Sequence, residues 1–281
     1  MRVEATTLWR LSVRLAEIQK AGLHHHPLGR TAVREADKAN AEYAARLKRR
    51  AAVLVPLCLL DGELGVLFTK RSATRVGSHK GHVSFPGGHM DAGETAREAA
   101  LREYEEEVGL GLGPGLAATA ALRPAATPPP PPSPPQLPSS SPWAGATCAL
   151  GELPPVRAVT GTMVFPVVGV LGQKGGEVLS GAGLQDMGGL LRGPGALAPP
   201  CPEVELVFGV SVRELLDPAH RTEEDLGYRG AVPRFQVSTR PPIWGLTAYI
   251  LDDVLRALTR EGDGPGGADG GAGAGGGSGS V

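Results

Sequence analysis

The chain has 281 residues, and its 28 lysines and arginines nearly balance its 29 aspartates and glutamates, which leaves a net charge of −1. This balance gives no reason to expect a nucleic acid or a membrane surface as partner, and no apolar run reaches the roughly 18 residues that a membrane span needs. The 41 glycines and 26 prolines predict that much of the chain lies outside regular packed structure.

The N-terminal part is predicted to be helical. Apolar residues at loosely helical spacing predict a helix over Thr7–Ala21, and a polar, alanine-rich stretch predicts a second helix over Thr31–Arg50. We therefore expect residues 1–50 to form an N-terminal helical extension ahead of the main domain.

Cysteine usage and the N-terminus bear on the compartment. Three cysteines without a CxxC pair argue against a disulfide framework or a structural zinc site, and they suit a reducing, intracellular compartment. Arginines spaced among apolar residues near the N-terminus are similar to those of a transit peptide, whereas Glu4 and Glu17 are untypical of one. Mitochondria, the cytoplasm and peroxisomes all stay open as the location.

The main domain is predicted to begin with strands. Ala52–Leu60 is a continuous apolar run of the kind that forms a buried strand, and Asp61-Gly62 is a turn signal that predicts a hairpin. The elements expected to follow are strands at Gly65–Thr69 and His82–Phe85, and a helix over Thr95–Val108 that ends at Gly109.

Low-complexity segments interrupt the second half of this domain, which we place at 51–261. Pro124–Pro142 holds 10 prolines and lies in a Pro-rich insert of about 113–150; a Gly-rich insert of about 174–200 follows, and 262–281 is predicted to be a disordered tail. Between these segments we expect strands at Thr162–Gly172, Val204–Val212 and Phe235–Val237, a short helix at Val212–Leu216, and an amphipathic helix over Trp244–Thr259.

Carboxylates on the helix Thr95–Val108 are the first chemical signal. Glu103, Glu106 and Glu107 have i, i+3, i+4 spacing and therefore share one helix face, whereas Glu105 falls on another face. Three like charges at this spacing repel one another, and Mg²⁺ or Mn²⁺, which prefer carboxylate oxygens and also bind phosphates, would offset them. Taken alone, the pattern also fits a solvated acidic helix face.

The residues around these glutamates favour metal binding over a solvated acidic helix face. The stretch GHMDAGETAREAALREYEEEVGL, from Gly88 to Leu110, resembles the Nudix box, the signature of the Nudix hydrolases. The resemblance implies an α/β/α sandwich with a mixed central sheet, and the hydrolysis of a diphosphate linked to another moiety. The fixed positions of the box are filled here by Gly88, Glu94, Arg102, Glu103, Tyr104, Glu106, Glu107, Gly109 and Leu110.

The same resemblance implies residue roles. Glu103, Glu106 and Glu107 would bind catalytic Mg²⁺ or Mn²⁺, and the carbonyl of Gly88 would add a ligand. Arg102 and Glu94 would pair to hold the glycine-bearing loop against the helix. The general base stays open between Glu103 and a residue of a later loop.

The segment before the box indicates a branch of the family. LFTKRSATRVGSHKGHVSFPGG, Leu67 to Gly88, and IWGLTA, Ile243 to Ala248, are similar to segments of the coenzyme A diphosphatase branch, although the spacing from Ser72 to Gly81 is one residue longer than usual there. Basic side chains before the box would meet the substrate's phosphates. The residues predicted to bind substrate are Arg71, Ser72, His79, Lys80, Gly87 and Gly88, with Lys70 and Arg75 in the same basic cluster.

The sequence thus predicts a metal-dependent Nudix hydrolase whose partner is a small nucleotide-diphosphate molecule. The expected reaction splits coenzyme A or an acyl-coenzyme A into 3′,5′-ADP and (acyl-)4′-phosphopantetheine. Three alternatives stay open: an ADP-ribose or NADH diphosphatase, a non-catalytic binding module that kept the fold, and a scaffold that acts through the proline tract. The acyl preference and the oligomeric state are left open by the sequence.

Overall fold

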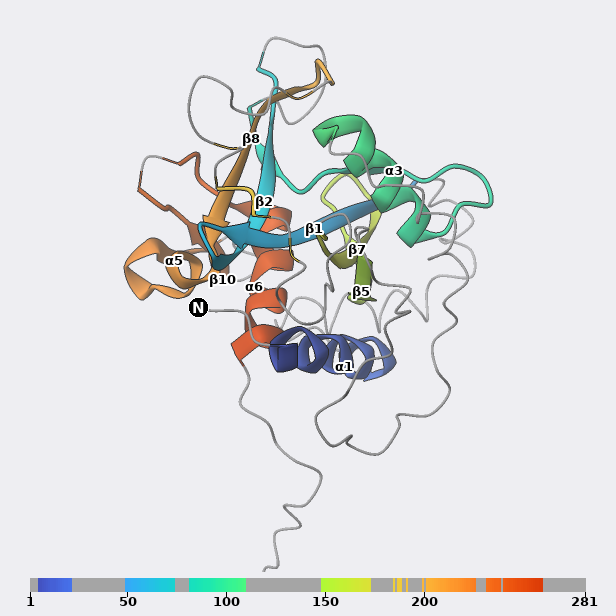
Figure 1. Cartoon of the computed structure of the whole chain (residues 1–281). Helices are drawn as coiled ribbons and strands as arrows, with labels where there is room; N and C mark the ends of the chain where they lie inside the picture. Colours follow the sequence, from blue (N-terminus) through green and yellow to red (C-terminus); the bar gives the residue numbers. More distant parts are fainter. Residues whose placement is uncertain are drawn as a thin grey trace, which may run out of the picture.

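The computed structural model describes residues 5–21, 49–73, 81–109, 148–172, 184, 186–188, 191, 199, 201–225, 231–238 and 240–259. Figure 1 labels the larger of the elements that these residues form. In chain order they are α1 (Ala5–Ala21), β1 (Arg50–Leu60), β2 (Glu63–Arg71), β3 (Val83–Ser84), β4 (Gly87–His89), α3 (Ala96–Val108), β5 (Cys148–Glu152), β6 (Val156–Arg157), β7 (Met163–Val170), β8 (Val204–Ser211), α5 (Val212–Leu216), the 3-10 turn η2 (Pro218–His220), β9 (Arg221–Asp225), β10 (Ala231–Phe235) and α6 (Gly245–Thr259).

A mixed sheet forms the centre of the molecule. Across the described ranges, eight strands join in one sheet along the path β3-β2-β1-β7-β5, with β4 paired to β1, β6 to β7 and β8 to β2. Strand β1 runs parallel to β7 and antiparallel to β2 and β4. Its apolar run suits this central place, because its side chains are buried on both faces of the sheet.

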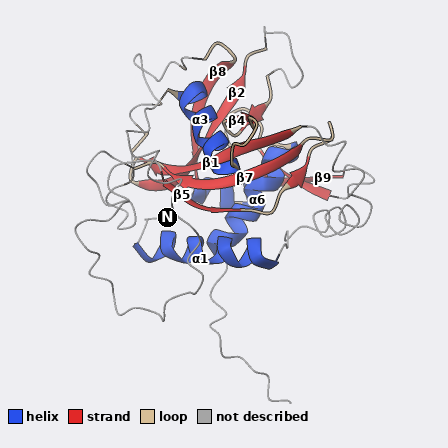
Figure 2. Cartoon of the chain, turned by 90° about the vertical axis from the view of Figure 1, so that its right-hand side faces the viewer, coloured by secondary structure: helices blue, strands red, loops and turns tan. Residues whose placement is uncertain are grey.

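Helices cover both faces of the sheet. Helix α3 lies on one face, and α1 and α6 lie on the other, as the view from the side shows (Figure 2). Residues of one strand divide between the two layers: Leu54 and Cys58 of β1 pack with α3, whereas Val55 and Leu57 pack with α6 and α1. The predicted α/β/α sandwich with a mixed central sheet is confirmed.

Helix α1 packs on the α6 face of the domain. Its residues Leu8, Leu11 and Leu15 are at most 1% exposed and belong to the same apolar core as α6. The Arg14 side chain also donates a hydrogen bond to the carbonyl of Ala257, at 2.8 Å. The division of the chain into an extension, a domain and a tail stays a prediction, but this helix is packed as an integral part of the sandwich.

Several predicted elements match the structure closely. The helix predicted from Thr7 is α1, and the Asp61-Gly62 turn joins β1 to β2, with both residues at positive φ. The predicted strands around 204–212 and 162–172, the short helix Val212–Leu216 and the C-terminal helix correspond to β8, β7, α5 and α6.

Other predictions need correction. Arg49 is not helical and Arg50 begins β1, so the predicted second helix does not reach Arg50; its residues up to 48 lie outside the described residues. Gly87 and Gly88 form the short strand β4, because their backbones pair with β1, although glycines normally disfavour strands. The strand predicted at Phe235–Val237 is instead β10, which ends at Phe235.

Strands β5, β6 and β9 were missed because their sequences are short or carry little strand signal. β5 (CALGE) lies at the end of the predicted Pro-rich insert and is short and glycine-bearing, and β9 (RTEED) is wholly polar yet pairs with β10. Within the Gly-rich insert, Leu184 and Asp186 form isolated bridges to Gly172 and Leu59. The proline tract Pro124–Pro142 and the tail 262–281 lie outside the described residues.

In the part of the chain that the structure describes, no helix combines the length and the apolar character that crossing a bilayer requires.

Candidate active site

Local signals fix both ends of α3. Thr95 caps the N-terminus in a capping box: its hydroxyl accepts a hydrogen bond from the Glu98 amide, and the Glu98 side chain accepts one from the Thr95 amide. The Glu98 side chain also accepts a bond from the Thr95 hydroxyl, which holds the pKa of this carboxyl below its usual range. Gly109 ends the helix in the left-handed conformation (φ 69°).

Strand β4 brings the glycine loop against α3. Gly87 and Gly88 pair with Val53 and Ala52 of β1, and the strand that they form contacts α3. The Gly87 amide donates a hydrogen bond to Glu107 Oε2 at 3.3 Å. A Cβ added to Gly88 would collide with the Glu103 carboxylate, so the carboxylate can lie this close to the loop only because residue 88 is a glycine.

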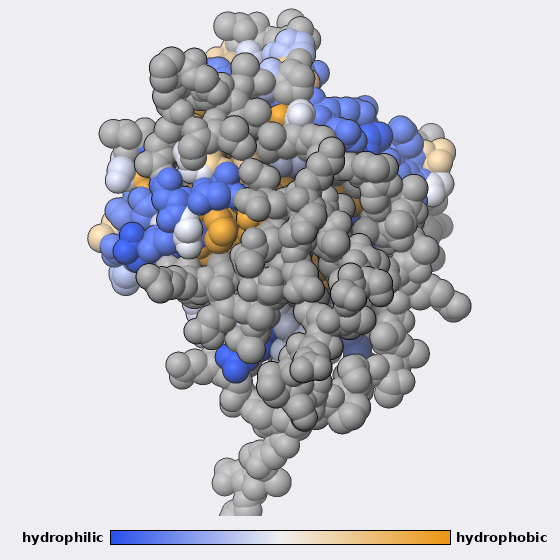
Figure 3. Space-filling model, viewed as in Figure 1, coloured by the Kyte–Doolittle hydropathy of each residue, from blue (hydrophilic) through white to orange (hydrophobic). Residues whose placement is uncertain are grey.

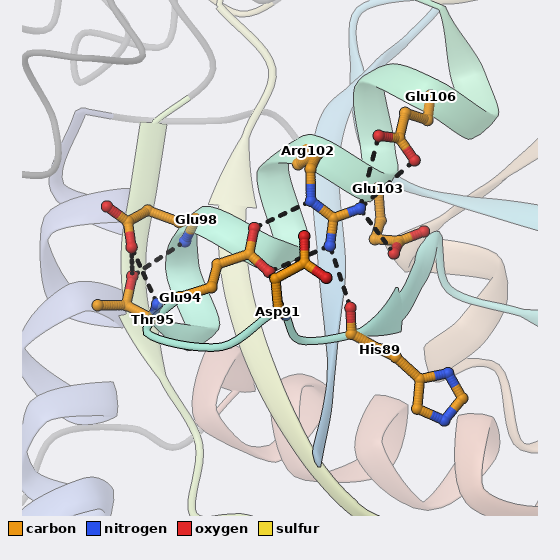
Figure 4. Close-up of polar contacts among 8 residues, drawn as sticks. All are labelled: His89, Asp91, Glu94, Thr95, Glu98, Arg102, Glu103 and Glu106. Atoms are coloured by element: carbon orange, nitrogen blue, oxygen red, sulfur yellow. Dashed lines mark hydrogen bonds and ion pairs between the residues drawn. The ribbon is translucent and has the colours of Figure 1, made fainter. Parts of the chain in front are cut away.

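Arg102 joins the loop to the helix, as predicted (Figure 4). It donates two hydrogen bonds to Glu94, from Nε at 2.9 Å and from Nη2 at 3.1 Å. Nη2 also donates to the carbonyl of His89 at 3.0 Å, and Nη1 donates to Glu103 at 2.9 Å. Because these bonds come from one planar guanidinium, they fix the loop and the carboxylates relative to each other. They also hold the pKa of Glu94 below its usual range.

The three glutamates of the helix face differ in burial. The Glu107 side chain is 8% exposed and that of Glu103 is 16% exposed, whereas Glu106 is 58% exposed. Burial raises the pKa of Glu107 to about 7, although Arg71 and the Gly87 amide act in the opposite direction. Burial also raises the pKa of Glu103, against the effect of Arg102.

The exposed side of α3 forms a hydrophilic patch on the surface (Figure 3). Glu105 and Glu106 are both exposed, and Glu105 lies off the face shared by the three glutamates, as the helical spacing predicted.

The basic residues before the box are partly paired with acidic residues of the β8 region. Lys70 Nζ lies 2.6 Å from Glu205 Oε1, and Arg71 Nη2 lies 2.9 Å from Glu203 Oε2. Arg71 Nη1 also lies 3.7 Å from Glu107 Oε1. The amide of Ser72 donates a hydrogen bond to the carbonyl of Glu203.

The remaining predicted basic residues, Arg75, His79 and Lys80, lie outside the described residues. Their part in the site stays a prediction from the sequence.

The oxygen ligands available on α3 are of the chemical type that a hard divalent cation prefers. Glu103, Glu106 and Glu107 offer carboxylate oxygens on one helix face, and the loop at Gly88 lies directly against Glu103. In the conformation described, Arg102 lies within 3.4 Å of Glu106 and 2.9 Å of Glu103, and no three metal-binding side chains of the described ranges converge into a preformed cluster. Binding of a cation would therefore accompany a rearrangement of these ion pairs.

Two features of the site were not foreseen from the sequence. The His89 carbonyl binds Arg102, and Glu203 binds Arg71 from a segment far along the chain. No local pattern marks Glu203; its role depends on the pairing of β8 with β2, which the sequence does not specify.

Comparison with known proteins places the chain in a family. Residues 48–140 match the family model described as the NUDIX domain. The human protein named mitochondrial coenzyme A diphosphatase NUDT8 is 33% identical over 226 residues, which cover 76% of this chain and 72% of that protein. The chain belongs to the Nudix hydrolase family.

Shorter matches to this Nudix chain have higher identity. The mouse protein of the same name is 53% identical over 74 residues, and Nudix hydrolase 3 of Caenorhabditis elegans is 57% identical over 58 residues. These two matches span only 35% and 24% of the length of those proteins. A MutT/nudix family protein from Enterococcus faecalis aligns over 76% of this chain and 67% of its own at 14% identity and a TM-score of 0.38; the family assignment rests on the sequence matches.

Proposed function

We propose that this protein hydrolyses the diphosphate bond of coenzyme A or an acyl-coenzyme A. Water would add across one P–O bond of the diphosphate bridge, and the products would be 3′,5′-ADP and 4′-phosphopantetheine or its acyl form. The observation that carries the proposal is the match to the human coenzyme A diphosphatase, because it extends over 76% of this chain at 33% identity.

The arrangement on α3 supports a hydrolase over a binding module. Glu103 and Glu107 are largely buried carboxylates that face the glycine loop, and the helix places Glu106 on the same face. Burying carboxylates side by side is unfavourable unless charges of opposite sign offset them, and here Arg102 and Arg71 supply part of that charge to Glu103 and Glu107. A binding module has no need of this arrangement, whereas a site for a cation and a diphosphate does.

The chain's residues would divide the work as follows. Glu103, Glu106, Glu107 and the Gly88 carbonyl would hold Mg²⁺ or Mn²⁺, and Arg102 with Glu94 would keep the loop against the helix. When bound, the cation would neutralise phosphate charge and make water a better nucleophile. The general base stays open between Glu103 and a residue of a later loop.

The proposal also names the residues that would recognise the substrate. We propose that Ser72, His79, Lys80 and the backbone at Gly87 and Gly88 line the path of the substrate's phosphates. Arg71 was expected to do the same, but its guanidinium contacts two carboxylates of the protein.

A panel of substrates tests the proposal. The purified full chain is assayed with coenzyme A, dephospho-coenzyme A, ADP-ribose and NADH, each with Mg²⁺, with Mn²⁺ and with a chelator, and products are identified by mass. We expect metal-dependent release of 3′,5′-ADP with the highest kcat/KM for coenzyme A. Preference for ADP-ribose or NADH would move the chain to that alternative, and absence of metal-dependent hydrolysis on every substrate would favour a binding module.

The compartment is a separate proposal. The names of the human and mouse relatives call those proteins mitochondrial, and we propose the same location for this chain. Fractionation of cells that express the full chain with a C-terminal tag would test it, and enrichment in the cytosol or in peroxisomes would contradict it.

A further inference from the structure

The β2–β8 pair contains an irregularity beside the acidic helix. Along most of its length each residue of β2 faces one residue of β8, but Lys70 faces Leu206 and Arg71 faces Val204. Glu205 is therefore the extra residue of a β-bulge on β8. Bulges change the direction of side chains and are frequent next to active sites. Here the bulge separates the partners of two neighbouring cations: Lys70 contacts Glu205, and Arg71 contacts Glu203.

Arg71 bridges this bulge and the acidic helix. Its Nη2 lies 2.9 Å from Glu203 Oε2, and its Nη1 lies 3.7 Å from Glu107 Oε1. The hydrogen bond from Ser72 to the Glu203 carbonyl, at 2.8 Å, fixes the backbone on which the ion pair is built. Because the guanidinium is planar and rigid, the ion pair between Nη2 and Glu203 also determines the position of Nη1.

The Glu107 carboxylate is consequently held from two sides. Oε1 faces Arg71 at ion-pair distance, and Oε2 accepts a hydrogen bond from the Gly87 amide. The 3.7 Å separation is too long for a hydrogen bond, so Arg71 orients the carboxylate while leaving the lone pairs of Oε1 available. Groups that orient a metal ligand in this way tune it strongly.

We propose that Arg71, held by Glu203 at the β8 bulge, is a positioning residue that fixes the Glu107 carboxylate and acts on catalysis through it. The inference deepens the proposed function and rests on it for its kinetic part. It differs from the expectation that Arg71 binds a phosphate of coenzyme A, because a phosphate would have to displace two carboxylates from the guanidinium.

The test compares four variants of the full chain. Arg71→Ala removes the bridge, Arg71→Lys keeps the charge on a single nitrogen that cannot serve both carboxylates, and Glu203→Ala releases the guanidinium. Glu205→Ala is the matched control, since it removes the same charge on the same bulge but its partner is Lys70. Mn²⁺ alone is titrated by calorimetry, kcat and KM are measured for coenzyme A and dephospho-coenzyme A, and thermal melts check that each variant folds.

Positioning predicts a specific pattern. Arg71→Ala should weaken Mn²⁺ binding and lower kcat by roughly tenfold, the usual effect of losing a group that orients a ligand. The loss of kcat should be the same for both substrates, with KM little changed. Glu203→Ala should give a smaller loss in the same direction, Arg71→Lys an intermediate one, and Glu205→Ala should resemble the wild type.

Simple electrostatics predicts the opposite sign for Arg71→Ala, because removing a cation beside the site should tighten Mn²⁺ binding. Tighter or unchanged Mn²⁺ binding in Arg71→Ala would therefore overturn the inference. So would an effect confined to KM for coenzyme A, which would return Arg71 to phosphate binding, or equal effects of Glu203→Ala and Glu205→Ala. If the wild type cleaves neither substrate while its Mn²⁺ binding still depends on Arg71 and Glu203, the proposed function fails and the positioning role stands.

Discussion

The close approach of β4 to α3 gives a sharp prediction for Gly88→Ala. A Cβ at this position would lie 2.5 Å from Cδ and 2.6 Å from Oε2 of Glu103, where real Cβ atoms essentially never come closer than 3.0 Å. The Glu103 carboxylate must therefore move by about half an ångström or more away from the loop. Gly88 does not have a positive φ, so the substitution acts through this displacement and not through backbone strain.

The expected effects on stability and on activity differ in size. Glu103 ends in a flexible side chain, so the overlap is relieved cheaply and the free energy of unfolding should fall by no more than about 1 kcal/mol. Displacing a group of the site by a fraction of an ångström is expected to lower kcat by roughly 10- to 100-fold, since misplacement by about 1 Å costs about a hundredfold. Mn²⁺ binding, measured by calorimetry, should weaken in parallel.

Gly93→Ala provides the matched control. Gly93 belongs to the same loop and has a φ of 85°, but a Cβ there would meet nothing within 4 Å. This variant should lose about 1–2 kcal/mol of stability through backbone strain while it keeps its turnover. The reasoning is refuted if Gly88→Ala retains wild-type turnover and Mn²⁺ affinity. It is also refuted if Gly88→Ala loses as much stability as Gly93→Ala, because its lower activity could then come from unfolding.

Three further predictions address the ligand, the C-terminal helix and the insert. Glu107→Gln should keep the fold and lower kcat by about a hundredfold or more, and near-normal turnover would remove Glu107 from the site. Asp252→Asn should cost about 1–3 kcal/mol in denaturant melts, because the buried carboxylate binds Arg221 at 3.0 Å and Arg256 at 2.7 Å; an unchanged midpoint would contradict this. Deleting Pro124–Pro142 should change stability little, since loop entropy costs only about 0.6 kcal/mol per doubling of length, and a loss of several kcal/mol would show that the tract packs on the domain.

Local features of the fold and site could be predicted because their causes are local. The spacing of Glu103, Glu106 and Glu107 determines that they share a helix face. The resemblance to the box predicted that Arg102 pairs with Glu94, and the structure contains this pair. The helix ends follow from the residues around Thr95 and Gly109 in the same way.

What could not be predicted depends on packing between distant segments. The spacing does not distinguish Glu106 from Glu107, yet Glu106 is exposed and Glu107 is buried. The reason is that α3 lies on the sheet with the side that carries Leu101 and Tyr104 facing inward. That orientation depends on the whole sheet and not on the helix sequence. The same reason explains the missed strands β5 and β9, whose residues gain their pairing only from neighbours brought by the fold.

The basic segment before the box shows how such packing changes a functional interpretation. In the sequence, Lys70 and Arg71 are two cations that precede a phosphate-binding loop, and phosphate is their natural partner. In the structure, β8 brings one carboxylate to each of them, so the described part of the segment presents far less unbalanced positive charge than its sequence indicates. If the substrate is coenzyme A, as proposed, recognition of its third phosphate would therefore fall more heavily on the predicted residues Arg75, His79 and Lys80. A substrate preference that survives the loss of Arg71 is thus the expected result and does not count against coenzyme A.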